Sequence, residues 1–205
     1  MVKFDMDVYL NKALKELDDR LCEMKVYPIE LNVVGGFALL LHGIRMHKDQ
    51  QTDIDYVGNA MPKAVKEVID EVGIRYRLGR DWINCDVVMS GLDLDDFEYA
   101  TGELHFEKAF ELNVITVNVL AKEDILRMKV IAIDTSYMAW KDGGDFTRYK
   151  DFADVKVLMK DLGWDIKQLR LNTDYYVMEP YIYKMIEKFN SEQNNDIHEI
   201  LGIEE

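Results

Sequence analysis

A strand-like segment that leads into two glycines and then into an apolar run constrains the fold of this chain most. Residues 29–34 (IELNVV) are rich in strand-forming residues, and Gly35-Gly36 follow at once. The next segment, FALLLHG at 37–43, is too apolar for a surface loop, so it predicts a short buried helix that ends at a glycine. The order strand, glycine pair and buried helix therefore indicates a sheet with helices packed against it.

The rest of the chain predicts an α+β fold, a mixed β-sheet flanked by helices. We expect residues 1–120, including an N-terminal helix, to form one domain, and residues 121–205 to form a helical lobe packed against it. Further strands are predicted at 52–57, 74–79, 82–89 and 114–120, an acidic loop with edge structure at 92–112, and a loop at 136–148. Further helices are predicted at about 5–25, 62–73, 122–133 and 149–163, and from about 174 with a break at Pro180.

The composition excludes some classes of protein. The chain is 48% hydrophobic and 31% charged, which is typical of a folded globular protein. Its net charge of −14 repels nucleic acid at long range and argues against a general DNA-coating role. We interpret Cys22 and Cys85 as reduced core residues. Because we see no signal peptide and no apolar run long enough to span a membrane, we expect a cytoplasmic protein without a membrane partner.

Two aspartates in the segment TDIDYV are the first candidates for chemistry. Residues i and i+2 of a strand point to the same face, so Asp53 and Asp55 present two carboxylates side by side, with Ile54 directed into the core. Adjacent carboxylates repel each other, and a divalent cation with a preference for oxygen ligands, Mg²⁺ or Mn²⁺, removes that conflict. A solvated strand end explains the same pattern, so the pair alone does not establish a metal site.

The glycine pair and a third acid add to the candidate site. A Gly-Gly step between a strand and a helix lets backbone amides approach a phosphate, although a tight turn needs glycine for steric reasons too. Gly36 and Asp53 are 17 positions apart, enough for a short helix and a return to the neighbouring strand. Asp86 lies in an apolar segment, INCDVVM, where a carboxylate needs a partner. If that strand lies beside TDIDYV, Asp86 completes a cluster of three carboxylates.

These motifs resemble the nucleotidyltransferase superfamily of the polymerase-β type. The pattern there is Gly-Gly or Gly-Ser after a strand, Asp-x-Asp on the next strand and a third acid on a later strand. More narrowly, VVGGFALLLHGIR, QTDIDYV, CDVVM, EDILRMKVIA and RYKDFADVKVLM resemble small bacterial proteins related to the AbiEii-type toxins of type IV toxin–antitoxin systems. The resemblance covers roughly residues 30–162 and implies transfer of NMP from an NTP to a hydroxyl acceptor.

Roles for individual residues follow from this resemblance. It implies that Gly35 and Gly36 hold the triphosphate and that Asp53 and Asp55 bind Mg²⁺ or Mn²⁺. Asp86 is expected to bind the catalytic metal and to help deprotonate the acceptor hydroxyl. The bound metals would neutralise the phosphates and lower the pKa of that hydroxyl.

The resemblance implies four further nucleotide contacts. Thr52 belongs to the nucleotide-binding group, and Lys129, in LRMK, is expected to reach a phosphate. Lys150 and Asp151 are expected to shape the nucleotide side from the helical lobe. Lys129 has an alternative as a partner of a core acid. The chain departs from the family pattern at Phe37, where many active transferases have a serine after the glycine.

Several functions stay open at this level. The acceptor is RNA, tRNA or a small molecule, and a cognate antitoxin protein is a candidate partner. One alternative is a catalytically silent member of the same fold that only binds a nucleotide or a protein. Another is an antibiotic adenylyltransferase, because the acidic chain suits a cationic drug. We interpret His42 as a helix-end residue that bonds nearby backbone in preference to a catalyst.

Overall fold

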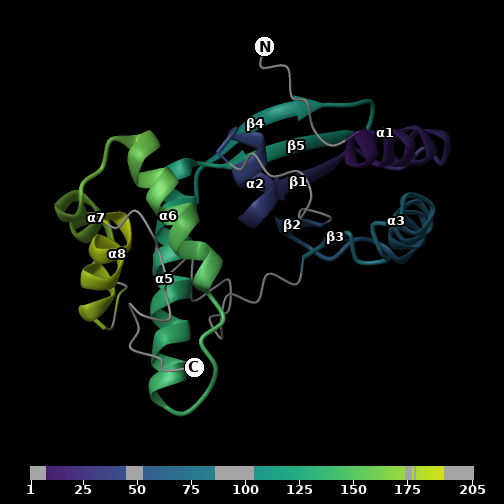
Figure 1. Ribbon diagram of the computed structural model, residues 1–205. Helices are drawn as coiled ribbons and strands as arrows, with labels where there is room; N and C mark the ends of the chain where they lie inside the picture. The colour runs from purple at the N-terminus through teal and green to yellow at the C-terminus, as the bar shows by residue number, and fades with distance from the viewer. Residues whose placement is uncertain (1–7, 45–52, 86–103, 174–176, 178, 192–205) are drawn as a thin grey trace. The chain divides into compact units, whose positions relative to one another are not determined.

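The computed structural model has an α+β fold in which five strands form one mixed sheet and seven helices accompany them, counted over the part of the chain that it describes (Figure 1). Residues 8–44, 53–85, 104–173, 177 and 179–191 are the ones described. They divide into two compact units: among the described residues, 8–85 and 105–121 belong to the first, and Leu104 and the residues from Lys122 onward belong to the second. Each unit is described by itself, as unit 1 and unit 2.

Unit 1 contains the sheet, whose strand order is β3-β2-β1-β5-β4. Strand β1 lies in the centre, parallel to β5 and antiparallel to β2. Strand β3 is parallel to β2, and β4 is antiparallel to β5. The strand bounds are Ile29–Val33 (β1), Ile54–Val57 (β2), Ile83–Asn84 (β3), Phe106–Glu111 (β4) and Ile115–Leu120 (β5).

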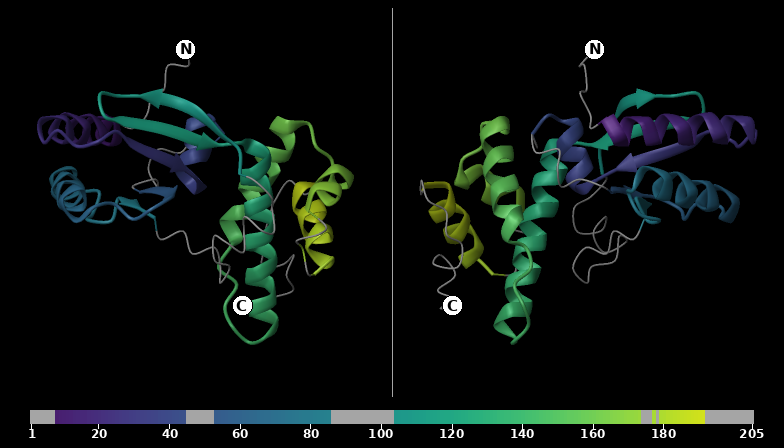
Figure 2. Two further views of the ribbon diagram at one scale, coloured as in Figure 1. Left: turned by 180° about the vertical axis from the view of Figure 1, so that it is seen from behind. Right: turned by 45° about the vertical axis from the view of Figure 1, so that its right-hand side comes forward.

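The helices of unit 1 are α1 (Val8–Glu23), α2 (Gly35–Leu41) and α3 (Lys63–Tyr76). Helices α1 and α3 run side by side (Figure 2). The leucines at 10, 14, 17 and 21 recur at helical spacing and are all buried, so they form the apolar stripe of α1. Met24, which continues the same spacing, does not belong to the stripe, because it lies beyond the end of α1 and is 47% exposed.

The segment 74–79, predicted as a strand, instead contains the last turn of α3 and the turn that follows it. Gly73 does not end the helix, as its position after Val72 suggested. The helix ends where Arg77 adopts a left-handed conformation, with φ of 60°. Gly73 is a glycine for a different reason, since a Cβ there would lie 2.4 Å from Cδ1 of Trp82. Close approach to Trp82, not helix capping, therefore selects this residue.

A buried carboxylate on α1 fixes the turn between β4 and β5. Asp18 accepts hydrogen bonds from the backbone N–H groups of Asn113 (3.0 Å), Val114 (2.8 Å) and Ile115 (3.0 Å). It also accepts one from the side-chain amide of Asn113, at 2.8 Å. A buried charge is tolerated only when its hydrogen bonds are satisfied, and here four donors satisfy it. Asp18 thereby joins α1 to the far end of the sheet.

We expect Asp18→Asn to destabilise the protein by about 2 kcal/mol, because an amide nitrogen would replace an oxygen that accepts backbone hydrogen bonds. The free energy of unfolding in urea, followed by circular dichroism, measures the change. Asp19→Asn is the matched control, because the neighbouring Asp19 is exposed and its substitution changes the net charge equally. Equal stability of the two variants would show that the Asp18 hydrogen bonds contribute nothing.

Unit 2 is helical and contains α5 (Lys122–Lys141), α6 (Tyr149–Leu162), α7 (Ile166–Thr173) and α8 (Tyr181–Ser191) (Figure 1). The prediction of α6 is confirmed, including its end at Gly163, whose φ is +67°. Two other boundaries were wrong. Helix α5 continues through residues 136–141, which were assigned to a loop, and α7 lies before residue 174, where the third helical region was expected to begin.

The long α5 is explained by contacts that its last turns make with other parts of unit 2. The ring of Tyr137 lies 5.5 Å from that of Trp140 and 6.1 Å from that of Tyr181, between ring centroids. Ser136 is buried, and its hydroxyl accepts a hydrogen bond from the backbone N–H of Thr147. Tertiary contacts thus extend the helix through residues 136–141, whereas Gly143-Gly144 lie in the turn after α5, as the loop prediction had it.

Two further predictions concern the cysteines and the membrane. Cys22 and Cys85 are both free thiols, but neither lies in the core: Cys22 is exposed and Cys85 is half-buried. Cys22 lies on the solvent side of α1, away from the leucine stripe, so the expectation of a core residue was wrong. No helix in the described ranges combines the length and the apolar character needed to cross a membrane.

Candidate functional site

The glycine pair and the Asp-x-Asp segment meet at one end of the sheet in unit 1. Gly35 begins α2 directly after β1 and has a φ of +65°, a conformation that favours glycine. A Cβ at this position would lie 3.0 Å from Oδ2 of Asp55. The backbone N–H of Val34 donates to the carbonyl of Asp55 at 3.0 Å, which holds the two segments together. The Asp55 carboxylate therefore lies against the glycine turn.

The second aspartate lies on the same side of the chain. Ile54 and Tyr56 are buried, whereas Asp53, Asp55 and Val57 are half-buried, so the polar and apolar positions alternate through this segment. Asp53 and Asp55 therefore share the face opposite to Ile54. Two half-exposed carboxylates on one face are a donor set that suits a hard divalent cation.

The third predicted acid, Asp86, and the predicted nucleotide residue Thr52 lie outside the described residues. The strand that leads to Asp86 does lie beside β2, because β3 pairs with it in parallel and Asn84 is in register with Asp55. Within the described ranges, no group of three or more His, Cys, Asp or Glu side chains is arranged to hold a metal ion. The described part of the candidate metal site is thus the Asp53–Asp55 pair.

Phe37, the departure from the family pattern, is fully buried in the core of unit 1. A serine at this position would lie in the core and would not reach a phosphate on the surface. The backbone groups at Gly35 and Gly36, next to Asp55, are therefore better placed than position 37 to approach a phosphate.

His42 has the structural role that its position at the end of α2 suggested. Its Nε2 lies 2.7 Å from the backbone carbonyl of Leu120, the last residue of β5. Because a carbonyl can only accept, this hydrogen bond places the proton on Nε2, and it joins the end of α2 to the end of β5. The adjacent N–H of His42 donates to the carbonyl of Ala38, so the residue also closes the helix.

Lys129 and Asp151 come together in unit 2, in a buried cluster that includes an acid that was not anticipated. The Lys129 ammonium forms ion pairs with Asp151 and, at 3.0 Å, with Asp154. The Asp151 side chain is fully buried, and those of Asp154 and Lys129 are 8% and 12% exposed. A guanidinium nitrogen of Arg148 lies 3.8 Å from the second oxygen of Asp151. Two acids are therefore neutralised within the unit, chiefly by one lysine.

A sequence signal for Asp154 existed. Asp151, Asp154, Val155 and Leu158 follow one another at helical spacing on the buried face of α6. An acid on an apolar helix face predicts a buried cationic partner, and Lys129 on the mostly apolar α5 is the complementary feature. Lys150 differs from its neighbour Asp151, because it is exposed on the outer face of α6.

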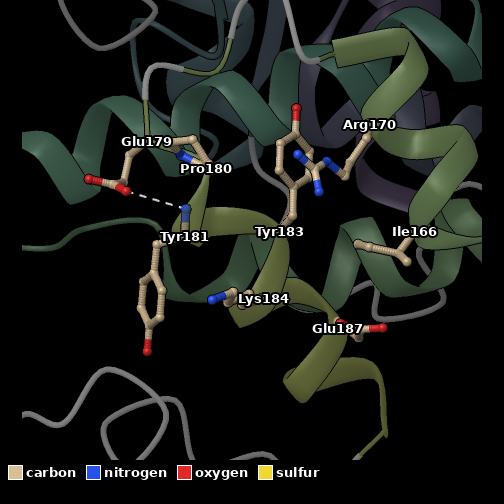
Figure 3. Close-up of a pocket in the computed structure, with 8 residues that line it drawn as sticks. All are labelled: Ile166, Arg170, Glu179, Pro180, Tyr181, Tyr183, Lys184 and Glu187. Atoms are coloured by element: carbon tan, nitrogen blue, oxygen red, sulfur yellow. Dashed lines mark hydrogen bonds between the residues drawn. The ribbon is translucent and has the colours of Figure 1, made fainter.

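A shallow groove of about 550 Å³ lies between α7 and α8 in unit 2 (Figure 3). The guanidinium of Arg170 lies over the ring of Tyr183, 5.1 Å from its centroid. The Tyr183 hydroxyl lies 2.9 Å from that of buried Thr173. Two basic and two acidic residues line the groove, so its charge selects neither anions nor cations. Its lining residues are Ile166, Arg170, Glu179, Pro180, Tyr181, Tyr183, Lys184 and Glu187.

One acid of this groove is engaged by a lysine outside it. The Lys141 ammonium donates a hydrogen bond to Glu179 at 2.7 Å, and this bond, followed by one from the Tyr181 backbone N–H, lowers the pKa of the Glu179 carboxyl. The carboxylate raises the pKa of Lys141 in return. Because Glu179 is held ionised by these partners, it is not suited to act as a general acid near neutral pH.

Searches of protein-family models, of curated proteins and of solved structures give no match to this chain. The geometry of its own residues therefore carries the functional argument.

Proposed function

We propose that this protein is a metal-dependent nucleotidyltransferase that moves NMP from an NTP to a hydroxyl acceptor. The observation that carries the proposal is the approach of Gly35 to the Asp55 carboxylate at the end of β1 and β2. A glycine turn, which would let backbone groups approach a phosphate, lies next to carboxylates that would attract a divalent cation, and an NTP needs both. The order of these motifs along neighbouring strands agrees with the nucleotidyltransferase pattern.

The proposed site consists of residues of unit 1. Gly35 and Gly36 would offer backbone groups to the triphosphate, and Asp53 and Asp55 would hold Mg²⁺ or Mn²⁺. A bound divalent ion would supply charge neutralisation at the phosphates and a lower pKa for the attacking hydroxyl. Asp86, two positions after Asn84 in the sequence, is the proposed third ligand.

The test is transfer of label from radiolabelled NTPs to any component of a cell extract in the presence of Mg²⁺. We expect the wild-type chain to label an acceptor and Asp53→Ala/Asp55→Ala to lose this activity, because the carboxylates that would hold the metal are removed. Asp19→Ala/Asp81→Ala is the matched control, because it removes two exposed acids of unit 1 and changes the net charge equally.

The outcomes separate the candidate functions. Equal labelling by the wild type and by Asp53→Ala/Asp55→Ala would overturn the proposed site. Calorimetry that shows NTP binding by the wild type, together with no transfer to RNA, tRNA, protein or small molecules, would favour the catalytically silent alternative. Circular dichroism of both double variants checks that a loss of labelling does not come from unfolding.

A further inference from the structure

One face of the sheet in unit 1 is polar, and it includes Asp55 of the proposed metal site. The alternate positions of β1, β2, β3 and β5 are buried and apolar on one face. On the other face, the same strands carry residues that are half-buried or exposed, here called the polar face, except for Leu120 at the end of β5, which is apolar and buried. Its members on these four strands are Glu30, Asn32, Asp55, Val57, Asn84, Thr116 and Asn118.

Two asparagines form a pair in the middle of the polar face. Asn32 on β1 and Asn118 on β5 are in register, and the Asn118 side-chain amide donates a hydrogen bond to Oδ1 of Asn32 at 2.9 Å. Asparagine is unfavourable in strands, and β1 and β5 are both interior strands, where β-branched residues fit best. A pair of amides at such a place lowers the intrinsic stability of the sheet, which favours a role in binding.

The pair retains hydrogen-bonding capacity after its internal bond is made. The side-chain nitrogen of Asn32 can donate two hydrogen bonds to a ligand, and the side-chain oxygen of Asn118 can accept hydrogen bonds from a ligand. Both side chains are half-buried, so the groups are accessible on the polar face. Neither residue is charged. The pair therefore suits an uncharged ligand group that presents a donor and an acceptor close together, not a phosphate.

The position of the pair relative to the proposed site indicates which part of a substrate it would contact. Asn32 is in register with Val57, two residues along β2 from Asp55, which places it about 8 Å from Asp55 by strand geometry. The strand that leads to Asp86, the proposed acceptor-side acid, pairs with the opposite edge of β2. The asparagine pair therefore lies on the nucleotide side of Asp55, not on the acceptor side.

We propose that Asn32 and Asn118 form the subsite for the nucleoside part of the NTP and set the selectivity of the protein among nucleotides. This inference rests on the proposed function. The asparagine pair would recognise an uncharged group that contains a hydrogen-bond donor and an acceptor. Both the edge of a base and the ribose hydroxyls provide such a group, and a base edge is a typical partner of an asparagine amide. With a triphosphate at Gly35 and Asp55, the nucleoside extends over the polar face to the asparagine pair.

Calorimetric titration of the full chain with ATP, GTP, CTP, UTP and dATP in the presence of Mn²⁺ tests the assignment. We expect the wild type to prefer one base, or ATP over dATP, by about tenfold or more, the discrimination given by one or two hydrogen bonds. Asn32→Val/Asn118→Val is expected to reduce this preference to about threefold or less. Its melting temperature should be unchanged or higher, because valine suits central strands.

Thr116→Val is the matched control, because Thr116 lies two residues from Asn118 on the same face of β5 and the change replaces a hydroxyl by a methyl group of similar size. It should keep the wild-type preference. Comparison of ATP, GTP, CTP and UTP tests recognition of the base, and comparison of ATP with dATP tests recognition of the ribose 2′-hydroxyl. Unchanged preference in the asparagine variant, or equal affinity of the wild type for all five nucleotides, would overturn this inference alone. Absence of NTP binding by the wild type would overturn the proposed function and this inference with it.

Discussion

Gly73→Ala is expected to destabilise the protein by about 3–5 kcal/mol, a large effect for the addition of one methyl group. The new Cβ would lie 2.0 Å from the carbonyl oxygen of Gly79 and 2.4 Å from Cδ1 of Trp82. Neither atom belongs to a flexible side-chain end, since the first is backbone and the Trp82 ring is buried. Backbone or ring must therefore move, and the gain of about 1 kcal/mol in helix propensity does not compensate.

The effect would extend from α3 to the proposed site through Trp82. The indole N–H of Trp82 donates to the carbonyl of Ile69 at 2.8 Å, one turn before Gly73. The backbone carbonyl of Trp82 accepts a hydrogen bond from the N–H of Ile54, the first residue of β2, which lies between Asp53 and Asp55. A displaced Trp82 would therefore shift the strand that carries Asp53 and Asp55, and metal or nucleotide affinity should fall together with stability.

The free energy of unfolding in guanidinium, followed by tryptophan fluorescence, tests this prediction. Glu67→Ala on the exposed face of α3 is the control, because it also places an alanine in the helix and removes only a side chain on the surface, whose ion pair with Lys63 is exposed. If Gly73→Ala is as stable as Glu67→Ala, the space between Gly73 and Trp82 is large enough for a methyl group and the prediction is wrong.

The elements around the proposed site were predictable because local pattern and tertiary packing agree there. Most apolar residues of β1, α2 and β2 are buried, and Ile54 separates two half-exposed aspartates. At Gly73 the same kind of reasoning failed. A glycine after Val72 is a typical helix end, and only its contact with Trp82, nine residues later, reveals that the helix passes through it.

The sequence also did not predict which polar residues far apart in the chain form hydrogen bonds with each other. Asp18 has its hydrogen-bond partners at residues 113–115, and nothing local to α1 indicates this. The asparagine pair joins residues 86 positions apart, and its significance depends on the register of β1 with β5. A sequence can show that a single residue is unusual for its helix or strand. Which residue it pairs with can be known only from the strand order and register of the sheet.

Lys129→Met is expected to destabilise the protein by about 3–5 kcal/mol, because it leaves two buried carboxylates without their principal cation. Asp151 is fully buried and Asp154 nearly so, and Arg148, 3.8 Å from Asp151, cannot replace the contacts that the lysine makes. Methionine keeps the length of the aliphatic chain, so the change removes charge and hydrogen bonds with little loss of packing. Lys129→Met/Asp151→Asn/Asp154→Asn should recover much of the stability, because no buried charge then remains unpaired.

This variant also decides between the two roles considered for Lys129. Unfolding in guanidinium, followed by the fluorescence of Trp140 and Trp164 in unit 2, reports the stability, and calorimetry with an NTP reports the binding. Lys160→Met, on the exposed surface of α6, is the control for loss of one positive charge. A large loss of stability identifies Lys129 as the cation of a buried structural cluster. Unchanged stability combined with a loss of NTP affinity would instead assign it to the phosphates, as the sequence resemblance implies.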